Sequence, residues 1–410
     1  MVKRKKPSDD EEELNQLQRF AVDQALAKKS FLLTGGAGTG KSVTVRAIIN
    51  ALRGKCTVSA STGIAALHIG GKTLHAVAKM GLASDSVEDL LHKHGATDVW
   101  TKVECLIVDE ISMVSADFFE KCDAMARAQR HCDEPFGGIQ VICSGDFGQL
   151  GPISGDFIFS GWNIHTKIEL TEVYRQKDAT FAELLNRVRT GDQTLADVER
   201  LRSRVGVDVP NATAIEPRRN AVAKINAEQL GRLPGAPHCF PRVTLTSSKK
   251  AAKLAQLLCK DVDEEITLKK DALVLLTANY APTKGLVNGS RGIVVGFDEE
   301  NNGLPIVQFA NVTTTIWPYC YELSEASITA KVGQIPLMLA WASTIHRVQG
   351  LSLDAVKINL GKEVFAPGQA YTALSRCRTF DNITLTEFEP SSLVPSAGLV
   401  GVVDMHDAAP

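Results

Sequence analysis

The sequence predicts an α/β protein: two parallel sheets flanked by helices, with a small β-barrel inserted into the second unit. Three observations lead to this prediction. Short apolar runs alternate with helical patterns, as they do in parallel α/β folds. The alternation ends near residue 170 and resumes near residue 213, so it describes two units. Between residues 292 and 336, short β-rich runs are separated by turn residues, which is typical of a small antiparallel barrel.

The composition is that of an ordinary globular protein. A chain of 410 residues, 44% apolar and 22% charged, is expected to form two or three domains and is neither disordered nor fibrous. The formal net charge is −2, so a nucleic-acid site would have to be a local groove. Nine scattered cysteines without a CxxC pair indicate reduced thiols. No apolar run approaches the roughly 20 residues of a membrane span.

Residues 1–13 are expected to be a disordered tail. The basic run Lys3 to Lys6 has no apolar segment behind it, so it is not a secretory signal, and acidic residues follow from Asp9 to Glu13. A nuclear-import or nucleic-acid-binding arm is the alternative interpretation of this tail.

The first unit is assigned to residues 14–170, with a short insertion at about 76–101. Apolar residues at helical spacing predict helices over 14–29, 43–52 and 116–130. Short apolar runs predict strands over 31–33, 57–60, 103–108 and 139–143.

The second unit is assigned to residues 171–291 and 337–390, on either side of the inserted barrel at 292–336. Its expected strands are 213–215, 272–276, 337–341 and 356–360, and its expected helices are 220–230 and 369–377. Residues 391–410 are rich in small residues and proline, so an irregular C-terminal tail is expected there.

The strongest motif is the segment 35–42, Gly-Gly-Ala-Gly-Thr-Gly-Lys-Ser, which fits G-x-x-x-x-G-K-[ST] between a strand and a helix. Glycines allow the backbone to wrap a phosphate, and the amides at the helix start favour anions. Lys41 would reach the β- and γ-phosphates of a nucleotide, and the Ser42 hydroxyl would bind Mg²⁺.

Further catalytic candidates follow later strands. Asp109 would hold the Mg²⁺ ion, and Glu110 would orient or deprotonate the attacking water. Gln149, in the turn after the strand at 139–143, would sense the γ-phosphate or the water. Arg175 and Arg376 are candidate arginine fingers, which neutralise charge on the transferred phosphoryl group.

These motifs resemble those of the PIF-type (petite-integration-frequency) DNA helicases, in the RecD-like branch of superfamily one. Matching segments follow the family's order over nearly the whole chain: 14–18, 61–67, 70–75, 109–114, 118–130, 285–292 and 344–350. The resemblance implies two RecA-like motor domains around bound ATP and an SH3-like inserted barrel.

The resemblance also extends the candidate site, because it makes Gln18 the residue that reads adenine. The nucleotide-binding set that it implies is Gln18, Gly36, Gly38, Thr39, Gly40, Lys41, Ser42, Val43 and Gly350. The DNA contacts that it implies are Thr62, His75, Asn288, Thr344, His346 and Arg347.

The sequence departs from the family's pattern at three places. Gly148 and Gly151 stand where the family usually has Phe and Pro around Gln149, which puts a base-stacking contact there in doubt. Arg347 replaces a more usual Lys and keeps the charge. The acidic signature around residues 121–123 is only partly matched.

The expected function is that of an ATP- and Mg²⁺-dependent DNA helicase that moves along single-stranded DNA and unwinds duplex or structured DNA. The resemblance alone implies 5′ to 3′ movement, a monomeric motor, DNA junctions as partners without a membrane, and roles in DNA repair, recombination and telomere maintenance. An intracellular location is expected, with the nucleus favoured and a mitochondrion or viral replication site left open. Two alternatives remain: a helicase for RNA or RNA–DNA hybrids, and an ATP-switched single-strand-binding module that does not unwind.

Overall fold

The computed structural model describes residues 14–409 apart from a set of short internal segments. These are 63–64, 67–68, 81–85, 95–98, 160–163, 211, 246–250, 253–254, 257–258, 260–261, 279, 282–283, 285, 287–289, 311, 326–327 and 404. The tail predicted over residues 1–13 therefore lies outside the described residues, as does Asn288.

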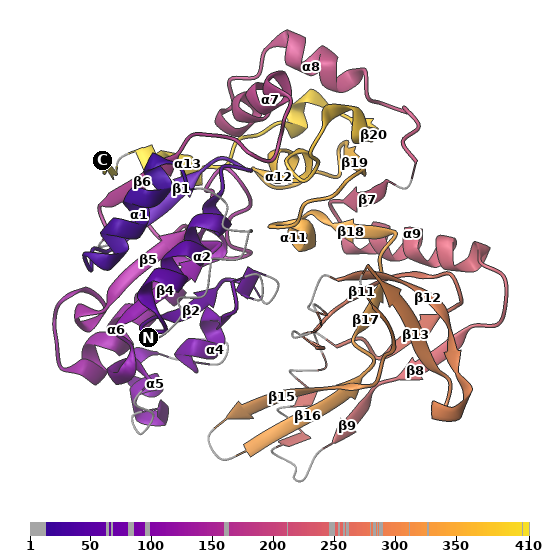
Figure 1. Ribbon diagram of the computed structural model, residues 1–410, viewed down its shortest axis with the longest axis horizontal. Coiled ribbons are helices and arrows are strands. Elements are labelled where there is room, and N and C mark those ends of the chain that lie inside the picture. Colours follow the sequence, from indigo (N-terminus) through magenta and orange to yellow (C-terminus); the bar gives the residue numbers. More distant parts are fainter. Residues whose placement is uncertain are drawn as a thin grey trace, which may run out of the picture.

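The first unit contains a seven-stranded sheet in the order β21-β6-β1-β5-β4-β2-β3, with every pair parallel. Its main strands are β1 (Phe31–Gly35), β2 (Thr57–Ala60), β4 (Cys105–Asp109), β5 (Gln140–Ser144) and β6 (Thr166–Leu170). β1, β4 and β5 are buried throughout, which explains their uninterrupted apolar sequences. Parallel pairing brings the carboxyl ends of these strands to one edge of the sheet (Figure 1).

Helices of the first unit begin where the sequence supplies caps. In α1 (Gln16–Leu26), Asn15 and Gln18 form a reciprocal capping box. Ser115 caps α6 (Ala116–Arg130), whose Phe118, Phe119 and Met125 are buried in the core. The remaining helices are α2 (Lys41–Leu52), α4 (Leu74–Ala78) and α5 (Val87–His94).

The second unit has a four-stranded parallel sheet in the order β18-β7-β19-β20. Its strands are β7 (Thr213–Glu216), β18 (Ala342–Thr344), β19 (Val356–Leu360) and β20 (Ile383–Phe388). Its helices are α7 (Ala179–Thr190), α8 (Leu195–Arg202), α9 (Arg219–Arg232), α11 (Ile345–Val348) and α12 (Gln369–Leu374). One core joins α7, α11 and α12 to this sheet, so α7 belongs to the second unit.

The inserted β-region is larger than the predicted 292–336, because antiparallel strands run from residue 238 to residue 339. They are β8 (His238–Pro241), β9 (Val243–Leu245), β10 (Glu265–Leu268), β11 (Leu273–Leu276), β12 (Arg291–Asp298), β13 (Leu304–Phe309), β14 (Thr313–Thr315), β15 (Tyr319–Glu325), β16 (Ile328–Gln334) and β17 (Leu337–Leu339). Among the described residues they form sheets of five, three and two strands, and a closed barrel stays a prediction. Figure 1 shows this region beside the second unit.

The predicted strands 272–276 and 337–341 were therefore assigned to the wrong sheet. β11 and β17 pair antiparallel with each other in the five-stranded sheet. Val274 and Leu276 point into the core of the β-region, while Leu273 and Leu275 stay half-buried. Because both faces are apolar, the sequence of β11 resembles that of a parallel strand buried on both sides. We propose boundaries near residues 238 and 339 for the insertion.

The C-terminal segment is not an irregular tail, which corrects the prediction for residues 391–410. It forms α13 (Gly398–Val403) and β21 (His406–Asp407), and β21 pairs with β6 at the edge of the first sheet. Val402 and Met405 enter the core of the first unit. Six residues of helix and two of strand are too short to give a readable period in the sequence.

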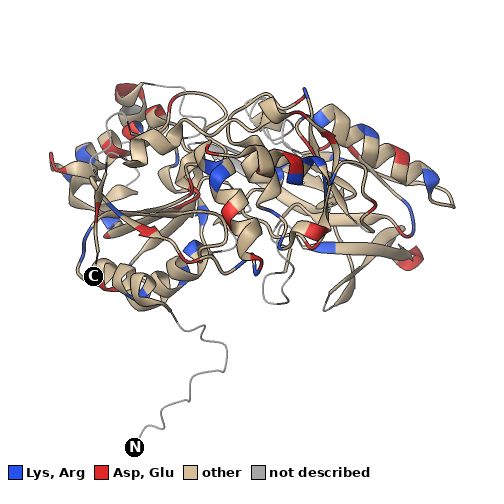
Figure 2. Ribbon diagram, turned by 90° about the horizontal axis from the view of Figure 1, so that it is seen from above, with Lys and Arg blue, Asp and Glu red and all other residues tan. Residues whose placement is uncertain are grey.

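Charged side chains are interspersed along both units, as Figure 2 shows. This distribution agrees with the near-zero net charge of the sequence. Within the described part of the chain, no helix has the length and apolar character needed to cross a bilayer.

Two neighbouring valines test whether the C-terminal segment is part of the first core. Val402 is 4% exposed and Val403 is 74% exposed. We expect Val402→Ala to lower the free energy of unfolding by about 1–3 kcal/mol, because buried methyl groups are lost and a cavity remains. The matched Val403→Ala should change it by less than about 0.5 kcal/mol. Equal urea-unfolding midpoints for the two variants would contradict the observed packing.

Candidate nucleotide site and nucleic-acid groove

The loop between β1 and α2 has the backbone geometry of a phosphate cradle. Gly35, Gly38 and Gly40 have φ values of 139°, 83° and 88°, which L side chains rarely adopt. A Cβ at Gly38 would lie 2.6 Å from Cβ of Arg175, and one at Gly35 would lie 2.4 Å from the Leu170 carbonyl oxygen. The loop therefore requires these glycines, and its role as a phosphate cradle stays a prediction.

Lys41, the first residue of α2, turns back onto this loop. Its Nζ donates hydrogen bonds to the carbonyl oxygens of Gly35 (2.8 Å) and Gly36 (2.9 Å). Burial lowers the pKa of Lys41, and the charges of Asp146 and Glu110 oppose this shift. The ammonium group is thus held in the cradle where a phosphate would replace the two carbonyl partners.

Other predicted nucleotide residues surround the same loop. The Thr39 hydroxyl donates to the Gly36 carbonyl at 2.9 Å. In the first turn of α2, Ser42 is exposed and Val43 is half-buried, so the Ser42 hydroxyl is free to meet an ion. Gly350 lies on the opposite side, with its ideal Cβ position 3.6 Å from Oε1 of Glu110.

Gln18 is held beside the loop by the cap of its own helix. Its Oε1 accepts from the Asn15 backbone N–H at 2.9 Å, and its Nε2 would be 2.5 Å from a Cβ on Gly40. The Asn15 amide also donates to Tyr174 Oη at 3.0 Å, and Tyr174 donates to Glu172 at 2.6 Å. These side chains form a polar edge next to the phosphate loop, which suits an adenine.

Asp109 and Glu110 follow β4 at the carboxyl edge of the sheet. Burial, with the nearby charge of Glu110, raises the pKa of Asp109 to about 6. Glu110 has a left-handed backbone (φ 51°), and its Oε2 accepts a hydrogen bond from Gln349 Nε2 at 3.1 Å. Gln349 follows α11, so a side chain of the second unit contacts the predicted catalytic carboxylate.

Gln149 and Arg376 meet across the two units. Arg376 lies after α12 and is 1% exposed; its NH2 donates to Gln149 Oε1 at 3.3 Å. Burial, with the charge of Arg175, lowers the pKa of Arg376 to about 10. Since a buried guanidinium favours an anionic partner, this arginine suits a triphosphate between the units.

Arg175 approaches the phosphate loop from the other side. Its backbone N–H donates to the Gly38 carbonyl at 3.3 Å, and its NH1 donates to the Ser375 carbonyl at 3.1 Å. Burial lowers the pKa of Arg175, as it does for Arg376. The two predicted arginine fingers thus both lie where the units meet: Arg175 contacts the Ser375 carbonyl of the second unit, and Arg376 contacts Gln149 of the first.

The donor set fits a magnesium nucleotide. The Ser42 hydroxyl and the Asp109 carboxylate are oxygen ligands of the kind Mg²⁺ prefers, and the glycine cradle leaves no room for side chains where phosphates would pack. When bound, the ion would neutralise phosphate charge.

Several residues at this site were missed by the sequence reasoning. They are Asp146, Gln176, Arg189, Gln349 and Tyr371. Gln349 lies inside the segment 344–350, which carries the family resemblance, so a motif signal was available for this residue. Arg189 gave no signal, because one arginine near the end of an amphipathic helix is usually exposed, whereas this one is 7% exposed.

A groove of about 700 Å³ crosses both units. The first unit contributes the loop after β5, and the second contributes the loop after β7, α11 and residues 365–367. Thr344, His346 and Arg347, three of the predicted DNA contacts, line it together with Arg218 and Arg219. Basic and polar groups around a groove suit a nucleic-acid backbone.

Exposed apolar side chains complete this groove. Phe365 is 58% exposed, and its ring is stacked near His346 with a centroid separation of 6.5 Å. Arg218 lies 5.4 Å from the centre of the same ring. Ile153, which is 85% exposed, faces the groove from the first unit. Exposed rings of this kind can stack on bases without regard to sequence.

Two of the remaining predicted DNA contacts, Thr62 and His75, are not among the described residues that line this groove. The Thr62 hydroxyl accepts from the Ala65 backbone N–H at 3.2 Å, which is a local cap. His75 stacks on Phe118 with ring centroids 3.8 Å apart. Asn288 lies outside the described residues. A role in DNA contact stays a prediction for all three.

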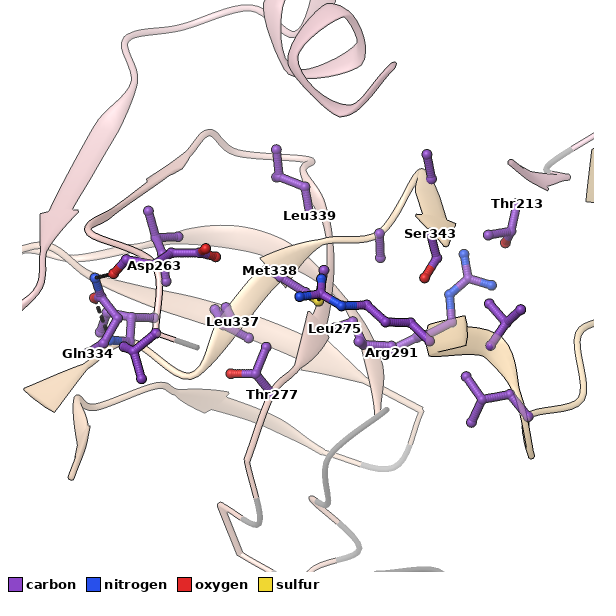
Figure 3. Close-up of a pocket in the computed structure, with 18 of the residues that line it drawn as sticks. Thr213, Asp263, Leu275, Thr277, Arg291, Gln334, Leu337, Met338, Leu339 and Ser343 are labelled. Atoms are coloured by element: carbon purple, nitrogen blue, oxygen red, sulfur yellow. Dashed lines mark hydrogen bonds between the residues drawn. The ribbon is translucent and has the colours of Figure 1, made fainter. Parts of the chain in front are cut away.

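Another pocket, of about 280 Å³, lies between the β-region and the second unit. Figure 3 shows the polar Thr277, Arg291 and Ser343 among apolar side chains such as Leu275 and Met338. None of the predicted nucleotide residues lines it. The pocket therefore marks the contact between the insertion and its host unit rather than the nucleotide site.

The two glycines that depart from the family's pattern have steric reasons. A Cβ at Gly148 would lie 2.5 Å from Cγ of Arg189, and one at Gly151 would lie 2.6 Å from Cζ of Phe157. The Phe157 ring, which also lines the groove, occupies the space beside Gly151. A larger residue at either position would displace these neighbours.

Replacing Gly148 by alanine should lower the free energy of unfolding by about 1–3 kcal/mol, because the site is already filled. The Arg189 guanidinium is bound by Asp146 at 3.0 Å, so its side chain is not free to move aside. Gly231→Ala in α9, where no atom lies within 4 Å of the ideal Cβ, is the matched control and should not destabilise. Unchanged thermal unfolding of the Gly148 variant would contradict this packing.

Comparisons with known proteins agree with this geometry. The family model of the PIF1-like helicases matches residues 12–199. The chain is 42% identical over 393 residues to the ATP-dependent DNA helicase PIF1 of Xenopus laevis, covering 91% of this chain and 61% of that protein. The crystal structure of Pif1 helicase from Candida albicans covers 95% of this chain and 98% of its own, with a TM-score of 0.86 and 30% identity.

A Pif1 helicase from Bacteroides, solved in complex with ADP-AlF3 and ssDNA, is similar with a TM-score of 0.74 and 28% identity, covering 96% of this chain and 97% of that one. The chain spans about three fifths of the length of the curated relatives it matches. The two units, each a parallel sheet flanked by helices, are RecA-like domains. On motifs, fold and sequence identity together, the chain belongs to the PIF1-like helicase family.

Proposed function

We propose that this protein is an ATP-dependent DNA helicase that translocates on single-stranded DNA and unwinds duplex or structured DNA. One observation carries the proposal. Thr344, His346 and Arg347, which lie in or next to α11, line the groove. Gln349, two residues after Arg347, donates a hydrogen bond to Glu110 in the nucleotide site. A single short segment therefore touches both sites, so a change at one is transmitted to the other.

The residues of the nucleotide site divide the chemistry of ATP hydrolysis among them. The amides of the phosphate loop and Lys41 would bind the phosphates, and Ser42 with Asp109 would hold Mg²⁺. Glu110 would take a proton from the attacking water, and Gln349 orients this carboxylate. Arg175 and Arg376 would stabilise negative charge as it develops on the transferred phosphoryl group.

Movement along a strand follows from this arrangement. ATP bound to both units would draw them together, and hydrolysis would release Gln149 and Arg376 from the phosphate. A strand in the groove, held by contacts from both units, would then advance by one step in each cycle. We assign 5′ to 3′ polarity from the family resemblance. Binding rests on phosphate contacts and stacking, so it is expected to be insensitive to sequence.

The named relatives support DNA as the substrate. They are called ATP-dependent DNA helicases, and one related study describes DNA unwinding at forked duplexes by two coordinating Pif1 helicases. We propose that ATP with Mg²⁺ is the cofactor of this chain and that single-stranded DNA and DNA junctions are its partners. We propose an intracellular location, with the nucleus favoured and a mitochondrion or a viral replication site as the alternatives.

The proposal predicts that single-stranded DNA strongly stimulates the ATPase rate and that the stimulation fades between low and moderate salt. Addition of a 5′-tailed duplex should give strand displacement, whereas a 3′-tailed duplex should not. ATPase rate and displacement of a labelled strand measure the two effects. Turnover that ignores DNA and responds to RNA would replace the proposal with an RNA helicase, and stimulation without displacement would favour a binding switch.

Two variants assign the turnover to this site. Lys41→Ala should abolish ATP turnover, because the phosphates lose their cationic partner. Glu110→Gln should still bind ATP but hydrolyse it at least about 100-fold more slowly, because the base is removed. Full ATPase activity in Lys41→Ala would show that the site is wrongly assigned, and normal turnover in Glu110→Gln would remove Glu110 from the catalytic role.

Arg347→Ala should weaken single-stranded DNA binding and reduce the salt dependence of the affinity by about one phosphate contact, a slope change of roughly 0.7. Fluorescence anisotropy of a labelled oligothymidine at several salt concentrations measures both. Arg202→Ala on α8, an exposed arginine outside the groove, is the control and should leave the slope unchanged. An unchanged slope for Arg347→Ala would remove this residue from the DNA contacts.

A further inference from the structure

A single carboxylate, Asp146, lies at the junction of the two units. It follows β5 and is fully buried. Its Oδ1 accepts hydrogen bonds from Gly148 N (3.0 Å) and Arg189 Nε (3.0 Å). Its Oδ2 accepts from Gln149 Nε2 (3.0 Å) and Tyr371 Oη (2.9 Å). All the oxygen lone pairs of this group thus have a directed donor.

Two of these donors come from the second unit. Arg189 lies near the end of α7, and Tyr371 lies in α12; both helices pack in the core of the second sheet. Their side chains are 7% and 3% exposed. The bonds to Asp146 therefore join the second core to the first sheet in a region without solvent.

The other contacts of this network lead to the reacting groups. Gln149, held through its Nε2 by Asp146, presents Oε1 to Arg376. The Tyr371 hydroxyl donates to Asp146 and accepts from the Ala37 backbone N–H of the phosphate loop at 2.7 Å. One carboxylate therefore connects the phosphate loop, the predicted γ-phosphate sensor and the second unit.

The charge of Asp146 depends on these partners. Burial alone would raise its pKa, but the charges of Arg189 and Lys41 hold the pKa at about 2. The group is therefore ionised at neutral pH. A buried charge that loses one partner is strongly disfavoured, so the arrangement fixes the position of each donor.

We propose that Arg189 and Tyr371 are positioning residues for ATP hydrolysis, which act through Asp146 to align Gln149 and to tie the phosphate loop to the second unit. This inference rests on the proposed ATPase function and adds two residues that touch neither the water nor the metal ligands. Tyr371 is the sharper test, because only its hydroxyl takes part in the network.

Tyr371→Phe keeps the ring in the core and removes both hydrogen bonds. We expect kcat for ATP without DNA to fall about tenfold, a loss of the size expected when hydrogen bonds around a buried charge are removed, while KM for ATP changes less than twofold. Arg189→Met should lower kcat further, and Arg189→Lys should recover part of the loss because it restores the charge beside Asp146.

Matched controls separate positioning from general stability. Arg187 lies two residues before Arg189 on α7 and binds Asp197 at 2.7 Å and 2.8 Å, away from Asp146. Tyr319→Phe changes a half-buried tyrosine in the β-region. Arg187→Met and Tyr319→Phe should leave kcat unchanged, although Arg187→Met is expected to lower the unfolding temperature.

A double-mutant cycle with Gln149→Ala tests the route of the effect. If Tyr371 acts through Gln149, Tyr371→Phe should lower kcat much less in the Gln149→Ala background than in the wild type. Additive losses, an unchanged kcat in Tyr371→Phe, or an equal loss in Arg187→Met would each overturn the proposal. A wild-type ATPase that ignores DNA would refute strand tracking but leave this test intact, because it uses the DNA-free rate.

Discussion

Parallel strand pairing is the constraint on which the rest of this structure depends. β1, β4 and β5 run side by side in the same direction, so the chain leaves all three at one edge. That edge receives the phosphate loop, the acidic pair Asp109 and Glu110, and the turn that holds Asp146 and Gln149. The second sheet is also parallel, and its following segments, α11 and α12, bring Gln349, Tyr371 and Arg376 to the same place. The candidate catalytic groups, which are distant in sequence, therefore converge at this edge, and the glycine loop and the left-handed Glu110 add special local conformations there.

Residues with local signals could be predicted from the sequence. The phosphate loop has a fixed spacing, and Asp109, Glu110 and Gln149 follow apolar runs that are easily read as strands. The contact between Arg189 and Asp146 could not be predicted from the sequence, because the two residues are 43 positions apart and belong to different units. The wider limits that we propose for the β-region were not predicted either. β8 and β9 are short and half-exposed or exposed, so they carry no alternation that distinguishes them from a loop.

Packing explains the two glycines around Gln149, which stand where the family usually has Phe and Pro. Gly148 lies against the Arg189 side chain, and Gly151 lies against the Phe157 ring, so the space that a larger residue would fill is already occupied. The change of residue type at these positions is therefore compensated by neighbours that come from later in the chain. The Arg189 side chain fills the space beside Gly148, and its guanidinium also neutralises Asp146. The packing around Gly148 is therefore linked to the electrostatics of the nucleotide site.

The return of the chain to the first sheet has a mechanical consequence. β21 pairs with β6, so the chain returns to the first unit after it has formed the second. In chain connectivity, the second unit and its β-region are therefore an insertion in the first unit. Two connections cross between the units, one between Leu170 and Ala179 and the other between Phe388 and Gly398. Two connections of this kind act as a hinge. They permit the second unit to rotate about the line through them but resist its translation and twisting relative to the first unit. A pulling force applied between Asn15 and Asp407 would also act on the first unit alone, because both residues belong to it. The second unit would not bear this force.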